Sequence, residues 1–451
     1  MKIVIVGDGR VGFTIAKQLC KEDHDIVVID SNPEVLNEIL ETLDVYVIEG
    51  NGAVLDVQRR ADVGNSDILI AATTNDELNI VCCMLAKKLG CKATIARTQN
   101  KDYVRQMQYM SKELGLSMIV SPPLAAAREM FRIIQFPSFL KRNSVAKGRV
   151  ELVELVISEE NILVDKALMD LTKLLKMDVL VCAVERDDEV FIPKGDFVLK
   201  AGDKISVTAP RSNLVKLIKK LNIYTQKIKN VMMVGGGAIA VNLAEELIKS
   251  GVSVKIIEKD IEICKQISEI LEDAIIINAD GTNHDLLLQE GIEKTDAFIS
   301  MTDIDEENIF ISMFANHLKV PKVITKMNRN EYTYLISDKG VGSIVCPKQL
   351  TADEIIRYVR AMENTDGTVQ TLISIIDHRA EVLEFVVGHN AKNLNRALMD
   401  IKLKKDVIIA CISHLGQFVI PKGTDSFAEG DTVVVVAKNE AEIREFNDIF
   451  M

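Results

Sequence analysis

Short apolar runs alternate with amphipathic stretches along the first third of the chain. The apolar runs fall at residues 2–6, 25–29, 45–48, 68–72, 94–96 and 118–120. The amphipathic stretches cover residues 11–21, 33–43, 78–89 and 103–114. Strands that alternate with helices of this length predict right-handed βαβ units around a parallel sheet. This region is therefore expected to be α/β, a Rossmann-like doubly wound domain.

The pattern changes after residue 150. Shorter strands are expected at 152–157, 179–184 and 204–208, around one helical stretch, and the Pro-Lys-Gly turn at 193–195 separates two of them. Such punctuation is typical of a compact α+β module.

The whole arrangement occurs twice. Residues 4–12 return as 232–240, and Ile-Pro-Lys-Gly at 192–195 recurs at 420–423. A repeat this long indicates duplicated domains and excludes a solenoid, whose repeats are ~20–50 residues. We expect nucleotide-binding domains at 1–142 and 228–364, and α+β modules at 148–225 and 368–451.

A glycine-rich loop lies between the first predicted strand and the helix that follows it. In Gly7-x-Gly9-x-x-Gly12, the first glycine allows a tight turn, the second lets a pyrophosphate approach the backbone, and the third packs helix on strand. Asp30 ends the next strand, where an acid holds a ribose hydroxyl. The alternative to nucleotide binding is a purely structural loop whose glycines serve packing alone. The candidate nucleotide contacts are Gly7, Asp8, Gly9, Arg10, Val11, Gly12 and Asp30.

The second copy repeats this loop as Gly235-x-Gly237-x-x-Ala240, with Glu258 as the acid. Alanine is an accepted third residue. Because duplicated sites diverge, this second site is either functional or vestigial. Its candidate contacts are Gly235, Gly236, Gly237, Ala238, Ile239 and Glu258.

Polar residues also follow the later strands of each copy. Thr73, Thr74 and Thr302 come after the fourth strand, at the carboxyl edge where open α/β sheets bind ligands. They contact a ribose or phosphate, or they only cap the loop. Asn51 and Asp280, at matching places after the third strand, complete this set.

Arg97 and Lys326 end the fifth strand, from which they reach a phosphate or point into solvent. The acidic runs at 75–77 and 303–307 complement helix dipoles, which explains them without any metal; metal binding by these carboxylates is the weaker alternative. The histidines show no metal-ligand spacing, and no nucleophile motif or phosphate-binding Walker loop is present. The sequence thus predicts nucleotide binding without catalysis.

An amphipathic helix is expected after the sixth strand of each copy, at 124–136 and 350–362. Because the sheet is already complete there, the apolar face of this helix has no obvious partner within its own domain. It covers its own module, or it crosses to a neighbouring domain or subunit, which we favour.

Composition narrows the function classes. The chain has 54 Lys plus Arg against 66 Asp plus Glu, a net charge of −12, and no Trp, so general nucleic-acid binding is disfavoured. Its longest apolar runs, such as 433–437, fall far short of the ~18–20 residues of a membrane span. Eight cysteines without a CxxC pair indicate a reduced, cytoplasmic protein.

Together these motifs resemble the TrkA family, the peripheral regulatory subunits of bacterial Trk potassium-uptake systems, in which each half is an RCK (or KTN) domain. The resemblance runs from residue 1 to about residue 450. It rests on residues 6–12, 30, 49–52, 73–79, 96–97 and 102–105, and in the second copy on 235–240, 258, 281, 302–308 and 420–423.

The resemblance implies binding of NAD(H) or of ATP or ADP at residues 7–11, Asp30, Thr73, Thr74 and Arg97, and again at 235–239 and Glu258. It also implies a homo-oligomer (a dimer or a tetrameric ring) that docks from the cytoplasmic side on a separate potassium-translocating membrane subunit and gates it. The main alternative is an NAD-dependent oxidoreductase. A ligand-sensing transcription factor is a third possibility, but the acidic chain lacks a basic reading helix.

Overall fold

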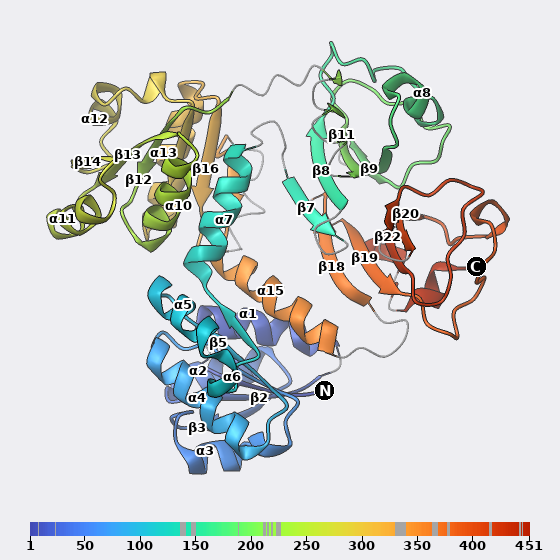
Figure 1. Ribbon diagram of the computed structural model, residues 1–451. Helices are drawn as coiled ribbons and strands as arrows, with labels where there is room; N and C mark the ends of the chain where they lie inside the picture. The colour runs from blue at the N-terminus through green and yellow to red at the C-terminus, as the bar shows by residue number, and fades with distance from the viewer. Residues whose placement is uncertain are drawn as a thin grey trace. The chain divides into compact units, whose positions relative to one another are not determined.

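The computed structural model describes residues 1–451 except 8, 23, 136–140, 146–149, 188, 211–212, 214–215, 218–219, 222–226, 330–339, 363–368, 377–378, 415–416, 442 and 444. It contains two compact units, each built from both halves of the chain (Figure 1). The first unit comprises Met1–Gln135 and Ile228–Val359, and the second comprises Phe136–Lys227 and Arg360–Met451.

The first unit contains two parallel six-stranded sheets with the same order. In the first sheet this order is β3-β2-β1-β4-β5-β6, and Ile3 of β1 lies opposite Ile26 and Ile68 on its two neighbours. Because the central strands are buried on both faces, they read as continuous apolar runs. The strands are β1 (Lys2–Val6), β2 (Asp25–Asp30), β3 (Tyr46–Glu49), β4 (Ile68–Ala71), β5 (Ala93–Arg97) and β6 (Met118–Val120).

Helices connect these strands. The helix predicted at 103–114 is two helices, and one further short helix follows β3. The helices are α1 (Arg10–Leu19), α2 (Pro33–Thr42), α3 (Leu55–Arg60), α4 (Asp76–Leu89), α5 (Lys101–Tyr109) and α6 (Ser111–Leu114).

The second sheet of this unit repeats the first in the order β14-β13-β12-β15-β16-β17. Its strands are β12 (Asn230–Val234), β13 (Ser253–Glu258), β14 (Ile275–Asn278), β15 (Ala297–Ser300), β16 (Lys322–Lys326) and β17 (Ser343–Val345). Its helices are α10 (Ala238–Lys249), α11 (Ile261–Ile270), α12 (His284–Gln289) and α13 (Asp305–His317). The predicted duplicated, doubly wound α/β fold is thereby confirmed.

Helix α7 (Pro122–Gln135) leaves the first sheet and packs on the second copy. Figure 1 shows it beside α10. Ala126, Ala127 and Met130 share a buried core with Ala240 and Leu243 of α10. The ion pair between Lys101 of α5 and Glu245 of α10 adds a polar contact between the copies. For α7, the expected crossing to a neighbouring domain is confirmed.

The matching helix of the second copy is α15 (Pro347–Met362). It also has a buried face, formed by Thr351, Ala352, Ile355, Ile356 and Val359.

The second unit contains two antiparallel five-stranded sheets of equivalent order, β10-β9-β11-β8-β7 and β18-β19-β22-β20-β21. Strand β7 begins at the end of the expected domain 1–142 and continues toward the expected start of the next domain at 148. The first sheet comprises β7 (Lys141–Val145), β8 (Val150–Val156), β9 (Leu180–Arg186), β10 (Glu189–Phe191) and β11 (Lys204–Pro210). The second comprises β18 (Val369–Ile375), β19 (Ala380–Val386), β20 (Val407–His414), β21 (Gln417–Val419) and β22 (Thr432–Lys438).

The two modules differ where one helix was expected. In the first module α8 (Leu171–Leu175) buries Leu171 and Leu175, which are four residues apart on one helical face. The counterparts are Ile401 and Lys405, so the apolar pair is missing and Ile401 has an extended backbone.

The modules of this unit also share a buried core, in which Cys182 and Ala183 of β9 join Ala410 and Cys411 of β20.

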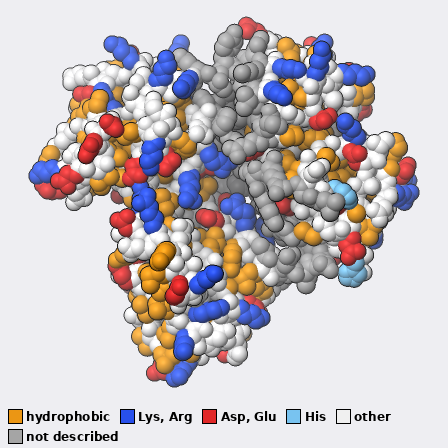
Figure 2. All heavy atoms as spheres, in the orientation of Figure 1, with side chains coloured by type: hydrophobic (Ala, Val, Ile, Leu, Met, Phe, Trp, Pro, Cys, Tyr) orange, Lys and Arg blue, Asp and Glu red, His pale blue; other side chains and the backbone are white. Residues whose placement is uncertain are grey.

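On the face drawn in Figure 2, basic and acidic side chains are intermingled. Among the described residues, no helix combines the length and apolar character of a membrane span.

Replacing Met130 by alanine tests the crossing of α7. Met130 is fully buried, and deleting such a side chain costs about 2–5 kcal/mol. We therefore expect Met130→Ala to lower the thermal unfolding midpoint in calorimetry. Met84→Ala, on an exposed position of α4, serves as the control and leaves the midpoint nearly unchanged. Equal midpoints for the two variants contradict this packing.

Candidate functional site

The first glycine loop has the backbone that its motif requires. Gly7 has φ 89°, and a Cβ there would lie 2.9 Å from the Thr73 amide nitrogen. A Cβ at Gly12 would lie 2.0 Å from the Gly7 oxygen, so this glycine allows the helix to pack on the turn. A Cβ at Gly9, by contrast, would meet no atom within 4 Å. Gly9 is the residue that leaves open space at the start of α1.

The second loop reproduces this geometry. Gly235 has φ 104°, and a Cβ there would lie 2.9 Å from the Met301 oxygen. Gly237 precedes α10 and again has nothing within 4 Å of an added Cβ. The third position is Ala240, which is fully buried. The second loop therefore keeps the same opening as the first.

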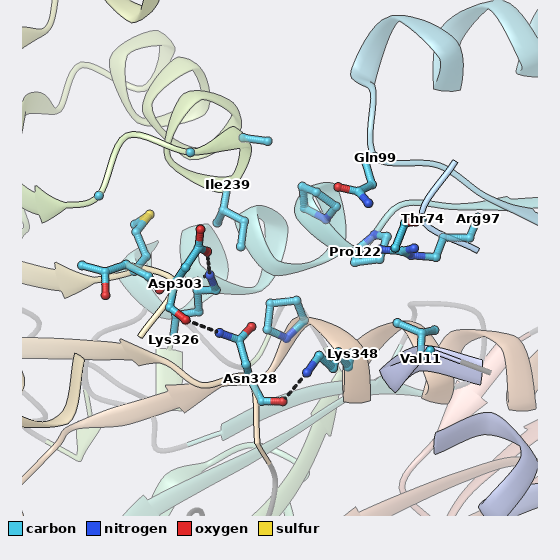
Figure 3. A pocket seen from close by; sticks show the side chains of 18 of the residues that line it. Val11, Thr74, Arg97, Gln99, Pro122, Ile239, Asp303, Lys326, Asn328 and Lys348 are labelled. Atoms are coloured by element: carbon cyan, nitrogen blue, oxygen red, sulfur yellow. Dashed lines mark hydrogen bonds and ion pairs between the residues drawn. The ribbon is translucent and has the colours of Figure 1, made fainter. Parts of the chain in front are cut away.

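Both loops line one cavity of about 1110 Å³ within the first unit. Figure 3 shows this cavity, with Val11, Thr74 and Arg97 from the first copy and Ile239, Asp303 and Lys326 from the second. The predicted residues that line it are Gly7, Gly9, Val11, Asp30, Asn51, Thr73, Thr74, Arg97, Gly235, Gly236, Gly237, Ala238, Ile239, Glu258, Asp280, Thr302 and Lys326.

The other three predicted residues are Gly12, Asp8 and Arg10. Gly12 lies behind the loop, against Gly7. Asp8 lies outside the described residues, as does the side chain of Arg10.

The two acids lie at the ends of β2 and β13. Asp30 Oδ1 accepts a hydrogen bond from the Asn32 amide at 2.9 Å. Glu258 accepts from the Asp260 amide at 2.8 Å and from the Gly236 amide at 2.7 Å. The bond from Gly236 holds the Glu258 carboxylate against its glycine loop, whereas the bond from Asn32 fixes the Asp30 carboxylate in the turn after β2.

The two cations are not solvated surface charges. Arg97 Nη1 donates to the Thr73 oxygen at 2.6 Å, and burial lowers the pKa of Arg97, an effect that Asp76 opposes. Its Nε is buried without a hydrogen-bond partner among the residues that the structure describes. Lys326, also buried, donates to the Thr302 oxygen at 3.2 Å and to Asp303 Oδ1 at 3.0 Å.

In each copy, a buried asparagine links the ends of two neighbouring strands. It was not among the site residues predicted from the sequence. Asn79 Nδ2 donates to the Thr73 and Arg97 oxygens at 3.0 and 2.8 Å. Its Oδ1 accepts from the Thr73 amide and hydroxyl, so this hydroxyl takes part in the loop, as the capping alternative expects. Asn308 makes the equivalent bonds to the Thr302 amide and to the Thr302 and Lys326 oxygens. The recurrence of this asparagine at matching positions in both copies was the sequence signal that could have predicted its role.

The acids that begin α4 and α13 do more than complement a dipole. Asp76 is buried and accepts hydrogen bonds from the Thr98 hydroxyl and the amides of Gln99 and Asn100. Asp305 accepts from the Asn328 amide at 2.8 Å in the same way. Each carboxylate thus positions the loop after the fifth strand.

Replacing Asn79 by alanine tests this bridge. The change leaves several buried donors and acceptors unpaired, which destabilises the fold by about 2–4 kcal/mol. We expect faster hydrogen exchange of the Thr73 amide and a lower unfolding midpoint. Asn65→Ala, at an exposed position with one side-chain bond to Asp62, is the matched control. Unchanged exchange at Thr73 contradicts the bridging role.

The arrangement suits a nucleotide with a pyrophosphate. The missing side chains at Gly9 and Gly237 leave room for phosphates at the positive ends of α1 and α10. Asp30 and Glu258 lie where an acid accepts from ribose hydroxyls, and the Arg97 guanidinium lines the same cavity as a candidate cation for a phosphate. Within the described parts of the chain, no group of three or more His, Cys, Asp or Glu could hold a metal ion.

Comparisons with known proteins agree with this geometry. The TrkA-N domain family matches residues 3–122 and 231–347, and the TrkA-C domain family matches 152–222 and 382–451. The chain is 34% identical to Trk system potassium uptake protein TrkA homolog 1 of Methanosarcina mazei, over 98% of each chain. It is 30% identical to Trk system potassium uptake protein TrkA of Halomonas elongata, over 100% of this chain and 98% of that protein.

Solved structures show the same fold. The RCK domain of GsuK has a TM-score of 0.64 at 16% identity, over 97% of this chain and 92% of that one. The GsuK channel bound to NAD has a TM-score of 0.64 at 17% identity, over 97% and 77%. Family matches in both halves and relatives that align end to end lead to one conclusion: the chain belongs to the TrkA family of Trk system potassium uptake proteins, with a TrkA-N and a TrkA-C domain in each half.

Proposed function

We propose that this protein is a regulatory subunit that binds NAD(H), and ATP or ADP, and gates a separate potassium-translocating membrane protein. It is not an enzyme in this proposal. It acts in the cytoplasm, held at the inner face of the membrane by its partner, as a dimer or a tetrameric ring. Its working parts are the four domains 1–142, 148–225, 228–364 and 368–451.

One observation carries the proposal. Gly9 and Gly237 each leave open space at a helix start, and both open into one cavity. An anion at a helix N-terminus is stabilised by free N–H groups and by the helix dipole. GsuK has been solved bound to NAD and, in another structure, bound to ADP, which supports nucleotides as ligands of this fold.

The proposed contacts are the residues predicted from the loops and strand ends. Asp30 and Glu258 accept hydrogen bonds from ribose hydroxyls, and Arg97 and Lys326 stabilise phosphate charge. The undescribed Asp8 and the Arg10 side chain remain part of the proposed first site, and Gly12 supports it from behind.

Valine at position 9 or 237 tests nucleotide binding. Its side chain enters the space that the phosphates need, so we expect Gly9→Val or Gly237→Val to weaken binding at the altered loop at least about tenfold. Calorimetric titration with NADH and ATP measures this loss, and circular dichroism checks the fold. Gly195→Val is the control, because a Cβ there has only ordinary contacts, at 3.6 Å or more. Unaltered titrations for both loop variants contradict the assignment.

Ion flux tests regulation. Because a ligand shifts an equilibrium only when it binds two states unequally, a nucleotide that regulates the partner is expected to change its flux. Proteoliposomes that hold this protein and its membrane partner report rubidium uptake with and without each nucleotide. The Gly9→Val, Gly237→Val double variant should lose the response. If neither nucleotide changes rubidium uptake with the unaltered protein, the regulatory proposal is wrong.

A turnover assay separates the alternative oxidoreductase. Regulation without catalysis leaves the NADH absorbance constant in the presence of carbonyl compounds, whereas steady, protein-dependent oxidation of NADH favours a dehydrogenase.

A further inference from the structure

The two halves of the cavity differ beside their equivalent cations. In the first half, Thr74 follows Thr73, whose carbonyl oxygen accepts a hydrogen bond from Arg97. In the second half the matching residue is Asp303, and its carboxylate pairs with Lys326 at 3.0 Å. Figure 3 shows the dashed line between Asp303 and Lys326, and Thr74 close to Arg97. The Lys326 charge is therefore neutralised from within the wall of the cavity.

The same change of charge occurs at two more matching positions. Asn51 of the first half corresponds to Asp280, and Leu78 corresponds to Glu307. Hydrogen bonds from the Thr282 amide and hydroxyl lower the pKa of Asp280. Three neutral residues of the first half are thus acids in the second.

Cations offset these acids only in part. Lys259 stands where the first half has Ser31, and Lys348, whose Nζ donates to the Asn328 oxygen at 2.6 Å, also lines the cavity. The second half is lined by five acids and three lysines, namely Glu258, Asp260, Asp280, Asp303, Glu307, Lys259, Lys326 and Lys348.

The first half is close to neutral. Its described charged lining residues are Asp30 and Arg97. In the loop itself, the sequence carries one acid and one base, Asp8 and Arg10, whose charges oppose each other. Asp76, which stabilises the charged form of Arg97, is already bonded by the hydroxyl of Thr98 and by main-chain amides. Among the described lining residues of this half, the Arg97 guanidinium is therefore the cation that an anion would meet.

We propose that the two halves sort nucleotides by charge. The first accepts highly charged nucleoside triphosphates, and the second selects nucleotides with fewer phosphate charges, such as dinucleotides with one pyrophosphate. Asp303 is the main determinant, because it is fully exposed and adjoins the cation that would otherwise face a phosphate. This inference rests on the nucleotide binding proposed above.

Single-loop variants isolate each half. Gly237→Val leaves the first half to be measured, and Gly9→Val leaves the second. Titrations with AMP, ADP and ATP at pH 8 in EDTA vary the charge on a constant adenosine. We expect affinity to rise with phosphate number in the first half and to stay flat or fall in the second.

Exchanging the determinant should transfer the preference. Asp303→Thr, placed in the Gly9→Val background, is expected to raise ATP affinity about tenfold and AMP affinity clearly less, because Coulomb energy scales with ligand charge. Thr74→Asp in the Gly237→Val background should lower ATP affinity by a similar factor. Asp303→Asn repeats the test with a side chain of nearly the same shape. Asp273→Thr removes an exposed acid outside the cavity and is the control.

The outcomes separate this inference from the proposal beneath it. Equal changes for AMP and ATP in the Asp303 variants indicate a structural role and overturn sorting by charge, while nucleotide binding itself stands. The same dependence on phosphate number in both halves also overturns it. If the unaltered chain binds no member of the series and no NADH, the proposed function fails, and the inference fails with it.

Discussion

The packing of α7 on the second copy is the interaction on which the candidate site depends. Met130 and the small residues Ala126 and Ala127 let α7 approach α10 closely within one buried core. The first residues of the same helix, Pro122 and Pro123, line the cavity. A single element therefore contributes both to the wall of the ligand space and to the core that joins the two copies. Without this crossing, the two sheets would lack the shared buried core that holds them beside one cavity.

Much of the fold follows from local patterns. Strands buried on both faces require continuous apolar runs, and the loop after β1 requires glycine where φ is positive or where backbone approaches backbone. Both constraints act over a few residues, so they can be read directly. The difference between α8 and its counterpart has an equally local cause, since Lys405 takes the place of a buried leucine, but it emerges only when the two copies are compared residue by residue.

The site was less predictable where its residues act over long sequence distances. Asn79 binds the carbonyl of Arg97 on another strand, and Asp76 binds amides that follow that strand. Neither role is visible from hydrophobic periodicity, because it depends on the order of β4 and β5 in the sheet. The charge of Arg97 could be anticipated, but its burial and its bond to the Thr73 oxygen could not.

Duplication explains how one cavity acquires two different halves. The backbone features that recur in both copies, such as the open Gly9 and Gly237 and the bridging Asn79 and Asn308, fix the shape of each half. Side chains on the cavity wall do not support the fold in this way, so Thr74 and Asp303 are free to differ. Two ligands, one in each half, affect each other's affinity only under one condition. Binding of the first must change the conformational energy of a helix or strand that the second ligand also contacts. Helix α7 connects the two halves within the first unit, because its start lines the cavity and its body is buried against the second copy.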